Sequence, residues 1–277
     1  MSLSACLMIK NEAESLPRCL ESLQTLASEI IVLDTGSSDQ SLQIASAFNA
    51  QILQRPWSGH FAQTRNQVLQ AAQGDWILNI DADEWLEPES SQALQAFLKQ
   101  APPAIYALRW QQAPDQPPSR KAVLFPNHRG VVYLGRVHEI PWDPSGQLPY
   151  QTLNHIELAH APRISPLSAQ KVKAYRHLLA QDLEHPNPIE RFHALRHWGQ
   201  SELILQNDRA ARAAFLAAWE LFRHLPAPCY AWGSTVLEAL LFLACETEQA
   251  EEYSFWRKVY AQAYPENPRL SSLPLEL

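Results

Sequence analysis

The sequence lacks the features that would place the chain in a membrane or on a nucleic acid. No apolar stretch approaches the roughly 20 residues that a membrane-spanning helix needs. The apolar run from Val236 to Cys245 is interrupted by Glu238 and predicts a buried helix. With 22 Lys and Arg against 29 Asp and Glu, the net charge is −7. General attraction to nucleic acid or to an anionic membrane surface is therefore disfavoured, and any basic site must be local.

Cysteine is scarce and unpatterned. Cys6, Cys19, Cys229 and Cys245 form no Cys-x-x-Cys pair, and three of them stand in apolar surroundings. This pattern is typical of reduced core residues in a cytosolic protein. The N-terminus runs directly into a strand-like segment without a charged start or a cleavage site, so we predict no signal peptide. We therefore expect a cytoplasmic protein.

The first part of the chain alternates strands with helices. At 277 residues, of which 46% are hydrophobic, the chain is long enough for one large domain or two small ones. Short apolar runs at Leu3–Ile9, Glu29–Leu33, Gln51–Gln54 and Trp76–Ile80 are separated by helical patterns. Four strands alternating with helices predict a parallel, doubly wound α/β sheet.

Two residues compete to begin the first helix. Asn11 with Glu14 fits a capping box, but a helix starting there would bury Pro17 in its interior at about 3 kcal/mol. Ser15 as N-cap places Pro17 in the first turn, where proline is tolerated, so we predict Ser15. For the next helix the predicted N-cap is Asp39.

An acidic stretch follows the fourth strand. Asp81 and Asp83 come directly after a buried apolar run, and ligands of open α/β sheets bind beyond the carboxyl ends of the strands. On a continuing strand, residues two apart point to the same face. Two such carboxylates repel each other, and Mg²⁺ is commonly held by one or two carboxylates plus substrate phosphates. The alternative is a turn and a solvated start to a helix at Pro88.

Other polar residues also have two readings. Asp34 either caps the turn that follows it or accepts the ring N–H of uracil or guanine, which cytosine and adenine do not offer there. Arg65 either holds a phosphate or a base, or forms a surface ion pair. His138 either positions Glu139 or is structural, and His160 either completes a metal site or is structural. Glu139 itself either takes part in the chemistry of the site or only pairs with Arg136 at a surface turn.

In the second half of the chain the predicted secondary structure changes twice, first to strands alone and then to helices alone. Short strands without intervening helices are predicted at 105–110, 121–125, 131–134 and 152–158, as a mixed or antiparallel extension of the sheet. From Pro166 the pattern is helical. Four helices in two hairpins are expected at 188–206, 208–224, 230–246 and 248–264, loosely like tetratricopeptide (TPR) repeats. We predict domains at residues 1–163 and 164–277.

Five segments in this order resemble a known family: Cys6–Glu12, Ile31–Asp39, Thr64–Asn66, Gly74–Glu84 and Gly135–Glu139. They are similar to the family-2 glycosyltransferases of GT-A fold, a Rossmann-like, mostly parallel sheet with flanking helices. The branch resembled contains lipopolysaccharide-core and peptide glycosyltransferases with helical-repeat tails. The resemblance covers about residues 3 to 160 well and the all-α tail loosely.

The resemblance implies an inverting transfer from a nucleotide-diphosphate sugar, with a UDP-sugar as the expected donor. The expected acceptor is a hydroxyl or thiol on a saccharide, a lipid-linked molecule or a peptide, and Mn²⁺ or Mg²⁺ assists. By the same resemblance Lys10, Glu12 and Asp34 line the nucleoside pocket, Arg65 reaches the base or phosphate, and Arg136 also contacts the nucleotide sugar.

The resemblance also assigns the groups nearest the chemistry. Asp81 and Ala82 lie on the donor's ribose side, and Asp83 holds the metal on the diphosphate. Glu139 is the general base with His138 beside it, and His160 is a further metal ligand.

Two other functions share these features. A nucleotidyltransferase can use the same sheet and metal, but no glycine-rich phosphate-binding loop follows the first strand. A catalytically inactive domain could serve a helical-repeat binding protein, but Asp83 and Glu139 are both retained.

Overall fold

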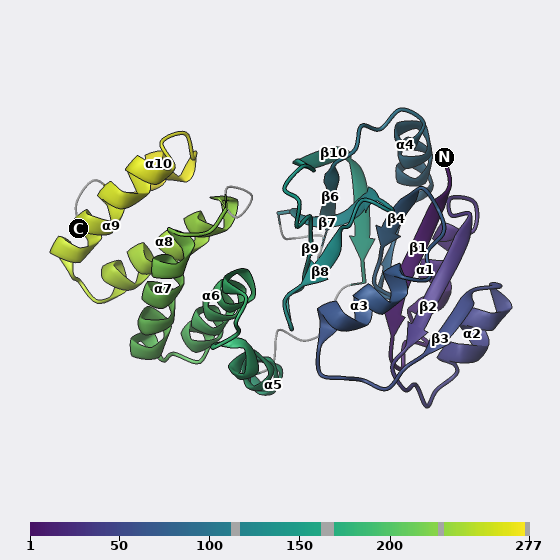
Figure 1. Cartoon of the computed structure of the whole chain (residues 1–277), viewed down its shortest axis with the longest axis horizontal. Helices are drawn as coiled ribbons and strands as arrows, with labels where there is room; N and C mark the ends of the chain where they lie inside the picture. Colours follow the sequence, from purple (N-terminus) through teal and green to yellow (C-terminus); the bar gives the residue numbers. More distant parts are fainter. Residues whose placement is uncertain (112–116, 162–168, 227–229, 275–277) are drawn as a thin grey trace. The chain divides into compact units, whose positions relative to one another are not determined.

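The structure is a computed structural model that describes the chain except residues 112–116, 162–168, 227–229 and 275–277. It divides into two compact units, residues 1–166 and 167–277 (Figure 1). The predicted boundary between residues 163 and 164 lies outside the described residues.

One mixed sheet organises the first unit, with the strand order β3-β2-β1-β4-β7-β6-β10-β5. Its strands are β1 (Leu3–Ile9), β2 (Glu29–Asp34), β3 (Gln51–Gln54), β4 (Trp76–Asn79), β5 (Glu84–Trp85), β6 (Ile105–Gln111), β7 (Ser119–Pro126) and β10 (Tyr150–His160). The first four strands are parallel, whereas β7 runs antiparallel to both β4 and β6. The predicted parallel half is confirmed, and β7, β6 and β10 form its mixed extension. The strand predicted at 131–134 is wrong as part of that extension, because β8 (Val132–Leu134) pairs instead with the unpredicted β9 (Ile140–Trp142) in a separate two-stranded sheet. The two-residue strand β5 was not predicted.

Helices cover both faces of this sheet, because its central strands are apolar on both sides. The helices are α1 (Leu16–Leu23), α2 (Ser41–Ala47), α3 (Phe61–Leu69) and α4 (Pro88–Leu98). Leu78 and Val32 pack in one cluster with residues of α1, α2 and α4, whereas Ile77 and Ile31 pack in another with residues of α3. Successive residues of a strand point to opposite faces, so each apolar run supplies two cores.

Two helix starts test the capping predictions. α1 begins after Ser15 with a proline in its first turn, as predicted, although the Ser15 hydroxyl does not cap the helix and donates instead to Glu12. The prediction of Asp39 as N-cap is wrong by one residue, because Gln40 occupies that position. The Asp39 carboxylate still accepts the backbone N–H of Ser41.

The cysteine prediction holds in part. Cys6, Cys19 and Cys245 are all free thiols, and Cys6 and Cys19 are buried in the first unit. Burial is the main cause that raises the pKa of Cys6 to about 12. Cys245 is exposed, so the core assignment is wrong for this residue. Cys229 lies outside the described residues.

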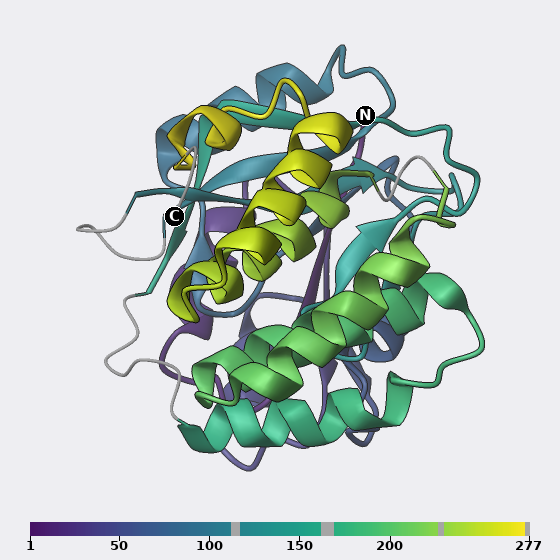
Figure 2. The ribbon, with the colours of Figure 1, turned by 90° about the vertical axis from the view of Figure 1, so that its left-hand side faces the viewer.

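The second unit is helical. Its elements are α5 (Ala169–Leu179), the 3₁₀ turn η1 (Ala180–Asp182), α6 (Pro188–Ile204), α7 (Asp208–Phe222), α8 (Tyr230–Glu246), α9 (Ala250–Ala263) and α10 (Arg269–Ser272). α6 contacts α7, and α8 contacts α9 (Figure 2). Both hairpin turns contain a residue with left-handed backbone, Gln206 at φ 59° and Glu248 at φ 53°. The two predicted hairpins are therefore present, around their own apolar core.

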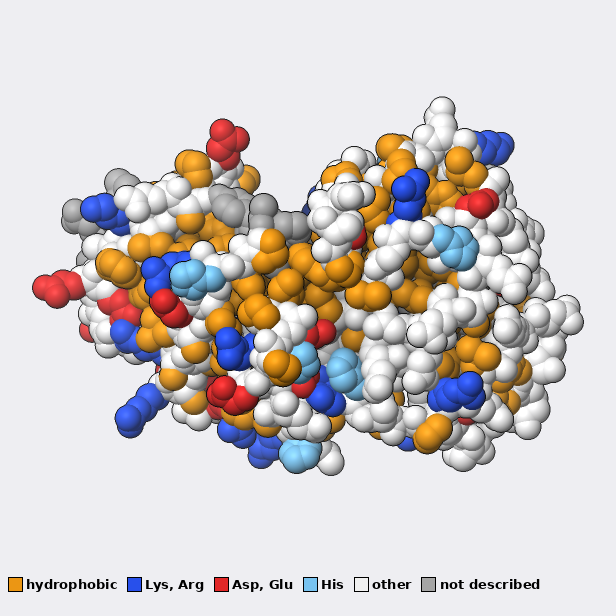
Figure 3. Space-filling view, viewed as in Figure 1, with side chains coloured by type: hydrophobic (Ala, Val, Ile, Leu, Met, Phe, Trp, Pro, Cys, Tyr) orange, Lys and Arg blue, Asp and Glu red, His pale blue; other side chains and the backbone are white. Residues whose placement is uncertain are grey.

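The surface of the helical unit carries charges of both signs. On the face in Figure 3, acidic and basic side chains of this unit are interspersed among hydrophobic ones. Among the described residues, no helix is both long enough and apolar enough to cross a membrane.

Candidate functional site

The acidic stretch forms a turn at the carboxyl end of the parallel strands. β4 ends at Asn79, and the chain turns through Ala82 and Asp83 into β5. The expectation that Asp81 and Asp83 share one face of a continuing strand is therefore wrong. β5 pairs antiparallel with the end of β10, with Glu84 opposite His160. This pairing brings the second half of the chain to the acidic turn.

Asp83 and His160 face each other across this junction. The Nε2 atom of His160 lies 3.1 Å from Oδ2 of Asp83, yet neither ring nitrogen of His160 makes a hydrogen bond within the described residues. The backbone holds the pair together, because the Ala161 N–H donates to the Asp83 carbonyl at 2.8 Å. The edge-to-face contact with Trp110, 5.5 Å between ring centroids, fixes the imidazole plane. His160 is 8% exposed.

This pair suits a divalent cation. Ligand atoms at right angles around an octahedral ion lie about 3 Å apart when each is about 2.1 Å from the ion. The 3.1 Å between Nε2 of His160 and Oδ2 of Asp83 is compatible with that spacing when the imidazole is neutral. One nitrogen and one oxygen donor fit Mn²⁺ better than Mg²⁺, which prefers oxygen alone. Within the described residues no group of three or more His, Cys, Asp or Glu could hold a metal, so a cation held by Asp83 and His160 would take its other ligands from outside the protein.

Asp81 makes a different set of contacts. Its Oδ1 accepts from Nη2 of Arg65 at 2.7 Å, and its Oδ2 accepts from Nζ of Lys121 at 2.6 Å. Lys121 also donates to Oε1 of Glu84 at 2.6 Å. The other Glu84 oxygen accepts the backbone N–H of Asp81 at 2.9 Å. Two carboxylates and two cations therefore alternate beside the Asp83–His160 pair.

These contacts determine the charge states. Burial alone would raise the pKa of Asp81, but the Lys121 and Arg65 cations outweigh it and hold that pKa well below its ordinary value. Glu84 behaves oppositely, because full burial and the Asp81 charge raise its pKa more than Lys121 lowers it. The pKa of Lys121 is raised, since Asp81 and Glu84 more than offset its desolvation. Asp81 is therefore an anion across the physiological range.

Glu139 comes from a hairpin loop on the α3 side of the sheet. The strands β8 (Val132–Leu134) and β9 (Ile140–Trp142) pair antiparallel with Leu134 opposite Ile140. The loop between them needs left-handed backbone at Gly135 (φ 95°) and His138 (φ 57°). It is anchored to the start of α3, where the Phe61 N–H donates to the Arg136 carbonyl at 2.9 Å.

Arg65 connects this loop to the acidic turn. Its Nε donates to Oε1 of Glu139 at 2.6 Å, while its Nη2 holds Asp81. Glu139 thus pairs with a distant arginine and not with its neighbour Arg136, whose Nη1 donates to the Gly59 carbonyl. The His138 side chain is exposed. The structure brings Arg65, Asp81 and Glu139 together as one chain of contacts.

The residues predicted for the nucleoside side lie in the loops after β1 and β2. Asp34 is buried, and its carboxylate accepts the backbone N–H groups of Gly36 and Ser37 at 3.0–3.1 Å. Asp34 therefore caps its turn. Because a carboxylate has about four acceptor sites, it can still accept a further hydrogen bond. Glu12 accepts from the Ser15 hydroxyl at 2.9 Å. Lys10 is exposed.

Several buried polar atoms around Asp81 and His160 lack partners within the described residues. They are Nη1 of Arg65, the Tyr133 hydroxyl and Nε1 of Trp110, besides the two nitrogens of His160. Buried polar groups are nearly always hydrogen-bonded in folded proteins.

No local sequence pattern indicates Lys121 or Glu84 as site residues. β4 and β7 pair antiparallel with Leu78 opposite Leu124, and continuing that register places Asp81 opposite Lys121. Lys121 stands alone as a basic residue at the start of a predicted strand. Its position opposite Asp81 follows only once the antiparallel pairing of β4 and β7 is known.

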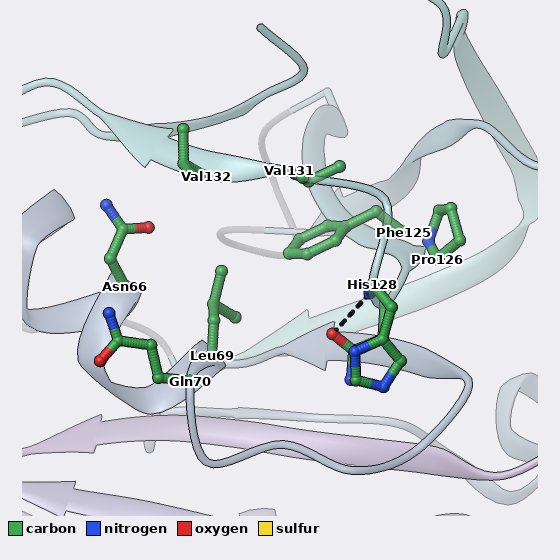
Figure 4. Close-up of a pocket in the computed structure, with 10 residues that line it drawn as sticks. Asn66, Leu69, Gln70, Phe125, Pro126, His128, Val131 and Val132 are labelled. Carbon is green, nitrogen blue, oxygen red and sulfur yellow. Dashed lines mark hydrogen bonds between the residues drawn. The ribbon is translucent and has the colours of Figure 1, made fainter. Parts of the chain in front are cut away.

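The pocket in Figure 4 is a separate feature. It measures about 210 Å³ and lies between the end of α3, at Leu69 and the following Gln70, and the β7–β8 connection at His128. Pro126 lies opposite Trp76, the first residue of β4, so this pocket is at the amino end of that strand. It contains none of the carboxylates described above.

Sequence comparisons relate the first unit to known proteins. Residues 4–156 match the family described as "Glycosyl transferase family 2". A TPR repeat-containing protein of Synechococcus elongatus is 42% identical over 139 residues, which are 50% of this chain and 34% of that protein. An uncharacterized glycosyltransferase of Rickettsia bellii is 39% identical over 87 residues, 31% of this chain and 29% of that protein. The chain spans about a third of the length of these curated relatives.

Solved structures share the fold. The crystal structure of S. aureus TarS 1-349 aligns with a TM-score of 0.53 at 14% identity, covering 95% of this chain and 92% of that one. The complex of the same protein with UDP-GlcNAc aligns with a TM-score of 0.50 over the same shares. At this identity the similarity establishes the fold alone.

Proposed function

The chain belongs to glycosyl transferase family 2, and from this premise we propose that it transfers a sugar from a UDP-sugar, with inversion, to an acceptor hydroxyl or thiol. The family makes it an enzyme of the glycosyltransferase class. The proposal extends this class to a donor, a metal and a set of residues. The acceptor belongs to a saccharide, a lipid-linked molecule or a peptide, as in the branch with helical-repeat tails.

The observation that carries the proposal is the Asp83–His160 pair. These two side chains present acceptor atoms 3.1 Å apart at the carboxyl end of the sheet, where a nucleotide binds in open α/β folds. Asp83 and His160 would hold Mn²⁺, or less readily Mg²⁺, against the donor diphosphate. When bound, the cation supplies charge stabilisation for the leaving diphosphate.

The remaining side chains bind and orient the donor. Arg65, which holds both Asp81 and Glu139, is the cation we assign to a phosphate or base oxygen of the donor. Asp81 and Ala82 form the ribose side, and the loop bearing Arg136 closes the sugar side. Lys10 and Glu12 border the nucleoside.

Glu139 accepts the proton of the acceptor group. Arg65 occupies its Oε1 atom, which leaves Oε2 to receive that proton as the acceptor oxygen or sulfur attacks the anomeric carbon. The bond from that carbon to the diphosphate breaks as the new bond forms on the opposite face, so the configuration inverts. His138 beside it orients the loop. Proton removal by such a base contributes typically 10²–10⁴-fold.

The products of the reaction test the function against its rivals. We would incubate the chain with Mn²⁺, UDP-, GDP- and CDP-sugars and candidate acceptors, and identify phosphorus products by ³¹P NMR. Glycosyl transfer releases a nucleoside diphosphate. A nucleotidyltransferase, run in reverse with added pyrophosphate, would instead make a nucleoside triphosphate and a sugar phosphate. An inactive binding protein would leave every donor intact.

Uridine is the expected base. Asp34 lies at the end of β2, where a ring N–H of uracil can reach a carboxylate oxygen in addition to the Gly36 and Ser37 N–H groups. Thermal shift with nucleoside diphosphates should show greater stabilisation by uridine than by cytidine or adenosine, with guanosine and thymidine between them. Equal stabilisation by the cytidine compound would mean that Asp34 only caps its turn.

The helical unit is proposed to position the acceptor as a TPR-like tail. Each unit has its own apolar core, so a chain of residues 1–166 should fold and retain donor binding. We expect it to lose most transfer to any acceptor that the full chain uses, while hydrolysing the donor at an unchanged rate. Undiminished transfer by a soluble truncated chain would contradict this role.

A further inference from the structure

The buried Glu84 carboxylate and Lys121 bond to each other and to the acidic turn at Asp81–Glu84. The Glu84 side chain is 0% exposed and that of Lys121 is 22% exposed. Glu84 receives Lys121 on Oε1 at 2.6 Å and the Asp81 N–H on Oε2 at 2.9 Å. The Glu84 N–H in turn donates to the Asp81 carbonyl at 3.0 Å. These bonds join both ends of the four-residue turn whose third residue is Asp83.

Lys121 also lies near Trp110, the aromatic residue that packs against His160. Its Nζ lies 5.4 Å from the centroid of the Trp110 ring, and that ring packs edge-to-face on His160. Glu84 lies opposite His160 in the β5–β10 pairing. This ion pair therefore contacts the elements that carry Asp83 and His160, through the backbone of the turn and through Trp110.

An ion pair in this position is not explained by stability alone. Burying two charges is expensive, and apolar residues of similar volume often serve a fold equally well or better. Buried polar or ionic groups can instead specify one arrangement, as they specify register in coiled coils. Here the geometry fixed is that of a turn at the edge where the donor is proposed to bind.

We propose that Lys121 and Glu84 are positioning residues, which hold the Asp81–Glu84 turn in the shape that directs Asp83 toward His160. The ligand that this geometry serves rests on the proposed function, whereas the coupling of the two residues does not. Lys121 also holds Asp81 in place through Oδ2, so that Arg65 and Lys121 fix both oxygens of that carboxylate.

Four variants of the full chain separate positioning from stability: Lys121→Met, Glu84→Gln, the double variant and Arg120→Met. Arg120 precedes Lys121 on β7 but bonds to Asn154 at the surface, so its replacement is a matched control for loss of a cation. Urea unfolding measures stability. Electron paramagnetic resonance of Mn²⁺, titrated in the presence of UDP, measures metal affinity of the folded protein without turnover.

Lys121→Met should raise the unfolding equilibrium constant roughly a hundredfold, because Glu84 is left buried beside Asp81 without its cation. Adding Glu84→Gln should recover at least about tenfold of this loss, which a double-mutant cycle reports as coupling. Mn²⁺ affinity with UDP should fall about tenfold in Lys121→Met and stay low in the double variant. Arg120→Met should change both quantities by less than about twofold.

Three results would overturn the proposal. Additive effects on unfolding would show that the two residues do not act as a pair. If the stable double variant bound Mn²⁺ with the same affinity as the native chain, the pair would have only a structural role. A comparable loss of affinity in Arg120→Met would assign the effect to general charge. If the native chain bound no Mn²⁺ with UDP, the proposed function would fail, and the unfolding cycle would still decide the coupling.

Discussion

Glu139→Gln should lower the rate of sugar transfer by roughly two to four orders of magnitude while leaving donor binding near that of the native chain. The amide keeps the shape of the side chain and can still accept from Arg65, but it cannot take up a proton. Because the Glu139 side chain is only 11% exposed and is held at 2.6 Å by Arg65, the substitution should not release the loop. The rate under saturating donor and acceptor and the calorimetric affinity for UDP measure the two quantities.

A control in the same unit distinguishes catalysis from loss of charge. Glu157→Gln removes a carboxylate that pairs at the surface with Arg109, and it should leave the transfer rate within about twofold. If Glu139→Gln transferred sugar at the native rate, or lost only thermal stability, Glu139 would be a structural partner of Arg65 and the general base would have to be sought elsewhere.

Local sequence signals were sufficient for the framework of the site. The apolar runs before Asp34 and Asp81 predicted buried parallel strands, and both end at the edge where the polar residues gather. Pro17 decided the start of the first helix, because a proline is tolerated in the first turn and not in the interior. These features depend on residues close together in the chain.

The contacts within the site depend on residues far apart. The alternative that Glu139 pairs with its neighbour Arg136 is wrong, because Glu139 is held by Arg65, which is 74 positions away. Lys121 reaches Asp81 through a register of β4 and β7 that no local pattern specifies. The sequence left open whether Asp81–Asp83 continues the strand or forms a turn, because the apolar run does not show where the strand's hydrogen bonds end.

Asp83→Asn should abolish most of the metal-dependent binding of the donor. The amide removes the negative charge that a divalent cation requires, and His160 alone supplies one neutral ligand. Loss of a residue that only supports a ligand typically costs 10–100-fold in metal affinity, so loss of a ligand itself should cost roughly a hundredfold or more. His160→Ala should act in the same direction with a smaller effect. Asp75→Asn, at a surface carboxylate that bonds to Ser2, is the matched control.

Calorimetric titration of UDP into the native chain tests metal-assisted donor binding most directly. The native chain and Asp75→Asn should bind UDP in Mn²⁺ with the same affinity. Addition of a chelator, or replacement of Asp83 by asparagine, should weaken that binding roughly a hundredfold. Equal affinity for UDP with Mn²⁺, with chelator and in Asp83→Asn would contradict a metal site at Asp83 and His160.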